Sequence, residues 1–269
     1  MPDMTDMAGE PAGPRQGAGD TIEAGETIAE QAAELATEVT EARQPEERRR
    51  LTAAFVAAAR SGARATGRGA RAVQRGTIAS SGWLTGQVVE MAPRVRVRNQ
   101  ARLRAQFPGL SIEDAADALI TGASRASATI GAGVGAWAAL PVLPAFPVEI
   151  VTETLALIGI EIKLIAELHE VFGTPAPGSF AERMTAYVAA WAQRRGVSVR
   201  PGAPALLLAA GSPLARLLRR RLAARAGRSA FSLGPMLTGA TAGAMLNRRE
   251  TKKLGEQIKR DLRRRAVAR

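Results

Sequence analysis

The chain has one histidine, His169, and the pair His169-Glu170 resembles half of a metal site. A zinc-protease helix needs a second histidine four residues later, where this chain has Gly173. A di-metal carboxylate bundle needs a glutamate three residues before the histidine, where this chain has Ala166. The chain has no cysteine, which excludes thiolate ligands, thiolate nucleophiles and disulfide bonds. We therefore predict no metal site and no catalytic residue.

Two glycine-containing stretches share part of a ligand-binding motif. Gly122-Ala-Ser-Arg-Ala126 lacks the second glycine of a nucleophile elbow. Gly131, Gly133 and Gly135 do not have the spacing of a dinucleotide-binding loop, and neither stretch follows a strand pattern. No P-loop sequence occurs either. The sequence thus predicts no cofactor and identifies no small-molecule substrate.

Two ionisable residues have unusual positions in a helix predicted over residues 148–172. Its apolar stripe has alternate spacings of four and three, and consists of Val151, Leu155, Ile158, Ile162, Ile165, His169 and Phe172. Glu161 lies between apolar neighbours, and we expect the other charged residues on the solvent side: Glu149, Glu153, Lys163, Glu167 and Glu170. We predict that His169 is a hydrogen-bonded core histidine. Glu161 is predicted to be a buried or interfacial carboxylate held by arginine, backbone or water. An enzyme of unknown class that uses Glu161 and His169 stays an alternative.

Two groups of arginines are candidates for contact with an anionic surface. The first has helical spacing and forms one stripe, made of Arg60, Arg64, Arg68, Arg71 and Arg75. The second follows the leucines of a helix predicted from Ser212, and consists of Arg219, Arg220 and Arg221. Near an anionic leaflet each arginine contributes ~1 kcal/mol, so we predict that these residues contact lipid phosphates. A solvated helix face is the alternative for the stripe.

Nucleic acid is the second candidate partner, because phosphate binding would use the same arginines and depend strongly on salt. The basic segments contain few aromatic side chains for base stacking, namely Phe55, Trp83 and Phe231. We therefore favour an anionic membrane surface or a membrane protein as the partner.

Charge is strongly segregated along the chain, whose net charge is +12. Residues 1–47 carry 12 acidic and 2 basic side chains, whereas residues 48–104 carry 13 arginines and one glutamate. Residues 105–193 carry 9 acidic and 3 basic groups, whereas residues 194–269 carry 3 acidic and 19 basic groups. Glutamates from Glu23 to Glu41 recur on one side of a predicted helix. We predict that this acidic stripe covers the arginine stripe when no partner is bound.

Two helical stretches present small residues instead of large side chains. Gly131 and Gly135 lie four residues apart in the first, and Gly239 and Gly243 do so in the second. Such faces let two helix backbones approach closely, although each glycine costs a helix ~1 kcal/mol relative to alanine. We predict that these two faces pack together in one bundle, with Asn247 as a buried polar residue.

Residues 126–148 form an uncharged stretch that is long enough for a bilayer helix. Three prolines occupy the last third of this stretch, and the next helix carries several carboxylates. A buried or interfacial hairpin is therefore favoured over a membrane-spanning one. No secretory signal is expected, because the N-terminus has no basic segment followed by an apolar one.

Three stretches together resemble the EcsC-like family. They are Thr129 to Pro147, Glu149 to Gly173, which ends in Ala166-Glu-Leu-His-Glu-Val-Phe-Gly173, and Gly239-Ala-Thr-Ala-Gly-Ala-Met-Leu-Asn247 leading to Thr251 and Gly255. The resemblance implies an α-helical protein with no established enzymatic activity. Because the type member is encoded beside an ABC transporter, it also implies an accessory role at the cytoplasmic face of the membrane. It carries over no catalytic residue.

These observations predict an all-α helical bundle with three segments. Residues 1–47 form an acidic, partly disordered arm, residues 48–108 a basic helical arm or linker, and residues 109–269 the EcsC-like domain. We expect a non-enzymatic accessory or scaffold protein that is cytoplasmic and peripheral at the inner membrane face.

Overall fold

The computed structural model describes residues 15–54, 81–137, 146–197, 214–218, 220–221 and 238–267. These residues form helices and connecting turns without a strand, which confirms the predicted all-α class. The helices are α1 (Arg15–Glu41), α4 (Ser81–Met91), the 3-10 helix η2 (Ala92–Arg94), α5 (Gln100–Gln106), α6 (Ile112–Trp137), α7 (Phe146–Val171), α8 (Phe180–Arg194) and α10 (Thr238–Val267). Residues 45–54 and 214–218 are also helical.

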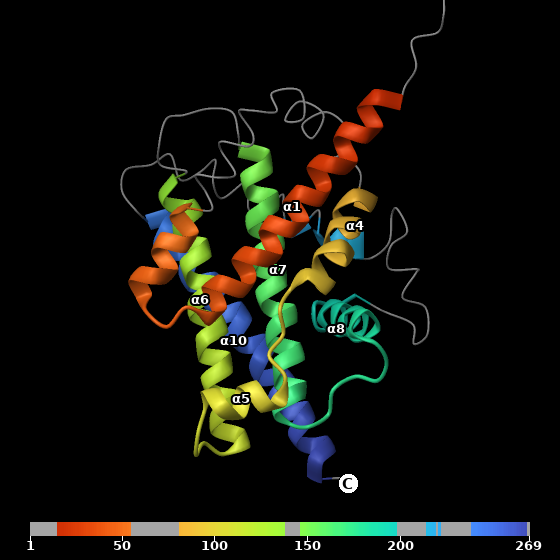
Figure 1. Ribbon diagram of the computed structural model, residues 1–269. Coiled ribbons are helices and arrows are strands. Elements are labelled where there is room, and N and C mark those ends of the chain that lie inside the picture. Colours follow the sequence, from red (N-terminus) through yellow and green to blue (C-terminus); the bar gives the residue numbers. More distant parts are fainter. Residues whose placement is uncertain are drawn as a thin grey trace, which may run out of the picture.

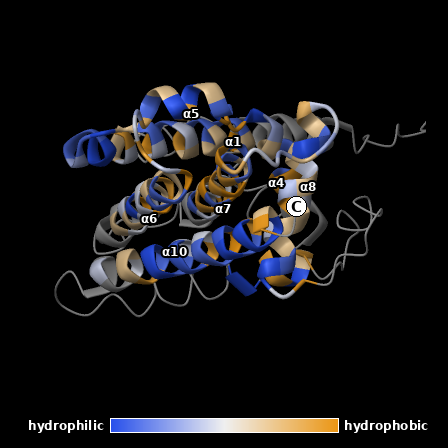
Figure 2. Ribbon diagram, turned by 90° about the horizontal axis from the view of Figure 1, so that it is seen from below, coloured by the Kyte–Doolittle hydropathy of each residue, from blue (hydrophilic) through white to orange (hydrophobic). Residues whose placement is uncertain are grey.

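The long helices are arranged around α7, which packs against α1, α6, α8 and α10 (Figure 1). Seen along the bundle, α1 and α10 lie on opposite sides of the α6–α7 pair (Figure 2). Helix α8 crosses the bundle beside α7. Helix α10 runs through Asn247 without a break, so the second glycine face and the basic residues after it belong to one helix.

Helix α7 is buried on all sides and not on one stripe. Every residue from 151 to 168 is buried, including Glu153, Lys163 and Glu167, which were expected to face solvent. Among the expected solvent-side residues, Glu170 is half-buried, and the side chain of Glu149 lies outside the described part. The prediction of a solvent-facing side is wrong because neighbouring helices cover every face of α7.

Small residues let the neighbours of α7 and α6 approach closely. A Cβ on Gly131 would collide with the side-chain amide of Asn247 and lie 3.2 Å from the carbonyl oxygen of Gly243. A Cβ on Gly243 would lie 3.5 Å from the carbonyl oxygen of Gly131. The structure therefore brings the first glycine face on α6 against the second on α10, and it buries Asn247 between them. The surroundings of Gly135 and Gly239 lie outside the described part.

Gly159 on α7 offers a test of this close packing. A Cβ on Gly159 would lie 2.8 Å from the Cβ of Ala36 on α1, so Gly159→Ala forces the two helices apart. We expect the free energy of unfolding to fall by about 1–2 kcal/mol in chemical denaturation, because overpacking outweighs the better helix propensity of alanine.

Gly122→Ala is the matched control, because a Cβ at this position in α6 meets no atom within 4 Å. Only the propensity change remains, so this variant should gain about 0.5–1 kcal/mol. Equal effects of the two substitutions would contradict the close approach of α1 and α7.

The N-terminal segments share one core with the rest of the bundle. Ile28, Leu35 and Val39 of α1 are buried in the same cluster as Met91 and Leu103 and as the apolar residues of α6, α7 and α10. The boundaries at residues 47 and 108 therefore mark changes in charge and do not separate packed units among the described residues.

Local sequence signals set several helix ends. Ser179 and Glu182 form a capping box, in which the backbone N–H of Ser179 donates to Glu182 Oε2 at 2.7 Å. The hydroxyl of Ser111 accepts from the backbone N–H of Asp114 at 3.1 Å, at the start of α6. Gly173 follows α7 with φ 66°, and Gly196 follows α8 with φ 80°, which permits the turn at each end.

Candidate functional site

Glu161 is a buried carboxylate at the meeting point of α6, α7, α8 and α10. The indole N–H of Trp191 donates to Oε2 at 2.6 Å, and Arg195 is ion-paired with Oε1. Thr251 Oγ1 lies 3.4 Å from Oε1 and 2.9 Å from the hydroxyl oxygen of Ser127. These partners hold Glu161 in the way that the sequence predicted, with arginine as the counter-charge.

Arg221 is the second cation at Glu161, and its predicted role as a surface contact is wrong. Its side chain is only 17% exposed and lies 3.7 Å from Glu161 Oε2 and 3.3 Å from Glu250 Oε2. Its guanidinium also lies 5.6 Å from the ring centroid of Trp191. We call these residues the Glu161 cluster: Ser127, Glu161, Trp191, Arg195, Arg221, Glu250 and Thr251.

The other predicted anionic-surface contacts divide into two groups. Arg220 is exposed. The arginine stripe and Arg219 lie outside the described residues, as does the predicted pairing of the stripe with the acidic residues of α1.

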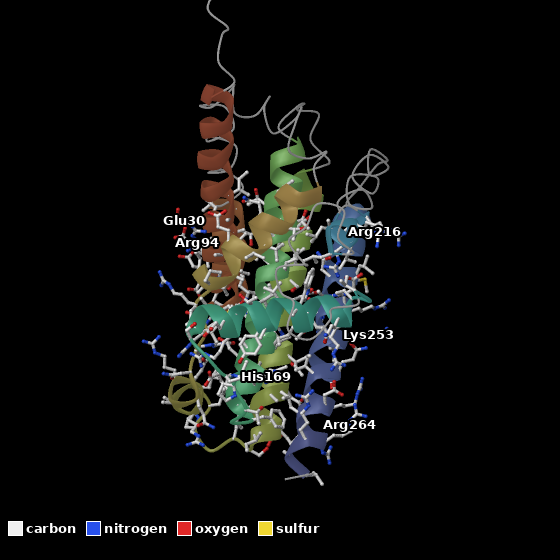
Figure 3. The ribbon with its side chains drawn as sticks, turned by 90° about the vertical axis from the view of Figure 1, so that its right-hand side faces the viewer. Glu30, Arg94, His169, Arg216, Lys253 and Arg264 are labelled. Carbon is white, nitrogen blue, oxygen red and sulfur yellow. The ribbon has the colours of Figure 1, made fainter. Side chains whose placement is uncertain are left out.

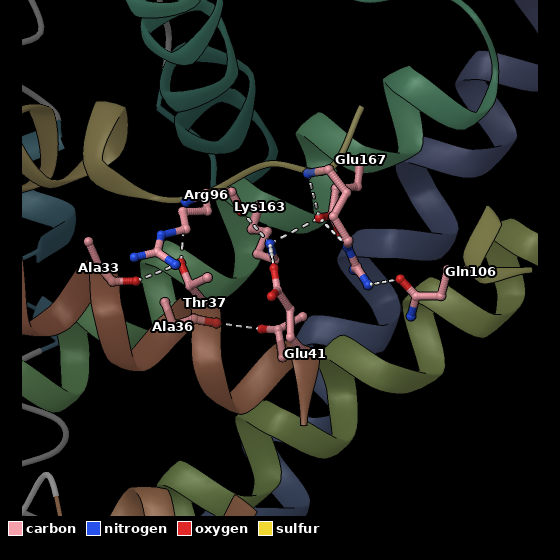
Figure 4. Close-up of polar contacts among 10 residues, drawn as sticks. Ala33, Ala36, Thr37, Glu41, Arg96, Gln106, Lys163 and Glu167 are labelled. Carbon is pink, nitrogen blue, oxygen red and sulfur yellow. Dashed lines mark hydrogen bonds and ion pairs between the residues drawn. The ribbon is translucent and has the colours of Figure 1, made fainter. Parts of the chain in front are cut away.

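A second buried group of charges was not predicted, and it connects α7 to α1 and to the segment before α5 (Figure 4). Lys163 is fully buried, and its Nζ lies 3.0 Å from carboxylate oxygens of both Glu41 and Glu167. The ammonium also donates to the carbonyl oxygen of Arg96. Arg98 Nε donates to Glu167 at 2.8 Å, and Arg98 Nη1 donates to Gln106 at 2.5 Å. These residues form the Lys163 cluster: Glu41, Arg98, Gln106, Lys163 and Glu167.

The charges of the Lys163 cluster stabilise one another against burial. Burial raises the pKa of Glu167, but hydrogen bonds from Arg98 and the charge of Lys163 outweigh it and hold the pKa below its usual range. Burial lowers the pKa of Arg98, yet its hydrogen bond and charge interaction with Glu167 raise the pKa overall. Glu167 and Arg98 therefore stay ionised and pair with each other inside the fold.

His169 lies apart from Glu161, eight residues or ~12 Å along α7. Its Nδ1 is 2.8 Å from the carbonyl oxygen of Thr174, and its ring centroid is 5.2 Å from that of Tyr187. Burial lowers the pKa of His169; the Thr174 carbonyl and Glu170 oppose the shift, and Arg265 adds to it. The neutral ring is therefore favoured in the fold.

This shift predicts a pH dependence of stability. Because the pKa of His169 is lower in the folded chain than in the unfolded chain, where it is ~6.5, the unfolded chain binds the proton more readily. The stability due to neutral His169 is thus present above pH ~6.5 and is lost as the pH falls through the folded-state pKa. Urea unfolding should show a smaller loss for His169→Gln than for the unmodified protein between neutral and mildly acidic pH. An equal loss in both would contradict the partial burial of the ring.

The outer side of α10 is strongly positively charged. It carries exposed basic side chains at helical spacing, together with the half-buried Glu256: Arg248, Arg249, Lys252, Lys253, Arg260, Arg263 and Arg264. Figure 3 shows Lys253 and Arg264 pointing away from the bundle, and α10 is largely hydrophilic in Figure 2. We call these seven residues the α10 cationic face.

Most of the α10 cationic face has no ion-pair partner among the described residues. Arg263 lies 3.9 Å from Glu113, and Arg264 is paired with Asp261. The remaining five basic residues form no ion pair with any residue that the structure describes. Lys259 differs, because it faces α6 and lies 3.0 Å from Glu113 and 2.7 Å from Asp117. The α10 cationic face could be inferred from the sequence, because the helical spacing of Leu254, Ile258 and Leu262 marks the opposite, buried side.

The described helices include none with both the length and the apolar character needed to cross a bilayer. Comparisons with protein-family models, with curated proteins and with solved structures gave no match to this chain.

Proposed function

We propose that the protein is a non-enzymatic accessory or scaffold protein that binds peripherally to the cytoplasmic face of a membrane. The α10 cationic face carries this proposal, because seven exposed basic residues and one half-buried glutamate, Glu256, share one side of a single helix. Clustered basic residues near an anionic leaflet contribute ~1 kcal/mol each, so the face is sufficient for reversible binding. The resemblance to the EcsC-like family, itself a prediction, supports the same cellular location.

The buried ionisable residues support a structural role for the interior. Glu161 and Glu167 accept hydrogen bonds and ion pairs from arginines, and Lys163 contacts two carboxylates. His169 is hydrogen-bonded to backbone and is not near Glu161. Each of these groups is thus engaged with the chain itself, and this favours a scaffold over the alternative of an enzyme using Glu161 and His169.

Nucleic acid is the competing partner for a cationic helix, and the composition of α10 argues against it. The helix contains no phenylalanine, tyrosine or tryptophan that could stack on bases. It carries exposed Met245 and Leu246 beside Arg248 instead. An apolar pair next to basic residues suits the boundary between phospholipid headgroups and acyl chains.

Cell fractionation tests this function directly. The full-length protein should sediment with membranes and be released by high salt, because salt screens the attraction between lysine or arginine and anionic lipid. Release by nuclease but not by salt would support nucleic acid, and recovery in the soluble fraction at low salt would contradict membrane binding.

A further inference from the structure

The α10 cationic face has an exposed apolar residue near each end. Met245 is 58% exposed and Val267 is 84% exposed. Positions 245, 249, 252, 256, 260, 263 and 267 recur every three or four residues, so both apolar residues lie on the same side of α10 as the basic ones. They are ~33 Å apart along the helix axis. The opposite side of α10 is packed against α6 and α7 through Asn247, Thr251, Leu254, Ile258 and Leu262.

This order of residues fits a bilayer surface better than a protein groove of opposite charge. Lysine and arginine can place their aliphatic stems against apolar groups while their charged ends reach phosphate. Met245 and Val267 carry no charge, and their transfer from water to an apolar environment lowers the free energy. A helix that lies along an anionic bilayer satisfies both requirements at once, with phosphates opposite its middle and acyl chains at its ends.

Helix α1 carries an exposed row of acidic side chains. Glu30, Glu34 and Glu38 of α1 are exposed at a spacing of four residues. Helix α1 lies across the α6–α7 pair from α10 (Figure 2). An anionic surface attracts the α10 cationic face and repels these three glutamates, so docking through α10 keeps the acidic row of α1 away from the membrane.

We propose that the protein docks on anionic phospholipid with α10 flat on the bilayer, Met245 and Val267 in contact with acyl chains, and α1 facing away from the membrane. This inference rests on the proposed membrane function and adds the docking surface, its orientation and the lipid class. Flat docking requires contact at both ends of α10, whereas a tilted helix would bring only one end to the bilayer.

The absence of cysteine from the chain allows a direct test with single-cysteine variants. Met245→Cys, Val267→Cys and Glu34→Cys each replace an exposed residue and take one environment-sensitive fluorophore. The labelled full-length proteins are mixed with phosphatidylcholine–phosphatidylglycerol vesicles that carry nitroxide quenchers on their acyl chains. Sedimentation of the same samples measures how much protein is bound.

We expect the fluorophores at residues 245 and 267 to shift to shorter wavelength and lose most of their emission to the quencher. The fluorophore at residue 34 should stay unquenched at equal bound fractions. Bound protein in which residue 34 is quenched, or in which only one end of α10 is quenched, would overturn the docking geometry and leave membrane binding intact. Failure of all three labelled proteins to sediment would overturn both the geometry and the proposed function.

Discussion

Replacing Glu167 with glutamine is expected to lower the free energy of unfolding by about 3–5 kcal/mol, because the substitution leaves buried cations without their main counter-charge. Lys163 is fully buried, and Arg98 contacts Glu167 through Nε at 2.8 Å and through its backbone N–H at 3.1 Å. Urea or guanidinium unfolding followed by circular dichroism measures the change.

Glu41→Gln is the matched control for this substitution. Glu41 contacts the same ammonium group at 3.0 Å as Glu167 does, but its side chain is 42% exposed. Water therefore screens the Glu41 pair, and its loss should cost at most about 1 kcal/mol. A double replacement, Lys163→Met with Glu167→Leu, removes both charges and should restore part of the stability lost in Glu167→Gln. Equal costs for Glu41→Gln and Glu167→Gln would contradict the assignment of Glu167 as the main buried counter-charge.

Glu161→Gln should be the second strongly destabilising substitution, at about 3 kcal/mol or more. The amide keeps the shape of the carboxylate and can still accept from Trp191. It removes the negative charge that Arg195 and Arg221 share inside the bundle. Because these residues come from α7, α8 and the segment before α10, thermal unfolding should shift as one cooperative transition.

Glu250 provides a control within the same cluster. It lies 3.4 Å from Arg195 and 3.3 Å from Arg221, but its side chain is 41% exposed. Glu250→Gln should therefore cost at most about 1 kcal/mol. If Glu250→Gln were as damaging as Glu161→Gln, burial would not be the reason for the importance of Glu161.

The position of α7 was predictable from sequence, but its burial was not. The alternation of apolar residues from Val151 to Phe172 identified the helix, because that spacing is intrinsic to an α-helix. Periodicity shows which side is the most apolar and does not show how many neighbours surround the helix. Lys163 and Glu167 are spaced as an i, i+4 pair, which is equally typical of a solvated surface. Their partner Arg98 comes from a distant part of the chain, so only the tertiary fold reveals the cluster.

The candidate surface was predictable in kind but not in place. Composition indicated basic segments that flank a more acidic centre, and Arg221 was assigned to the surface with its neighbours. Its position beside Glu161 and Trp191 depends on the tertiary fold, which brings together residues far apart in the sequence. The α10 cationic face, in contrast, was not assigned to the surface from the sequence. Leu254, Ile258 and Leu262 mark the buried side of α10 in the sequence, but the contacts of Gly243 and Asn247 are needed to show that this helix packs on α6.

Vesicle binding by a pair of charge-matched variants tests membrane attachment through α10 most directly. Lys252→Glu with Lys253→Glu reverses two charges on the α10 cationic face. Arg102→Glu with Arg104→Glu makes the same change in net charge at exposed positions of α5, on the α1 side of the bundle (Figure 2). With phosphatidylglycerol-containing vesicles at low salt, the α10 variant should bind at least about tenfold more weakly than the α5 variant. Equal binding by the two variants, or equal binding of the unmodified protein to vesicles of phosphatidylcholine alone, would contradict the account.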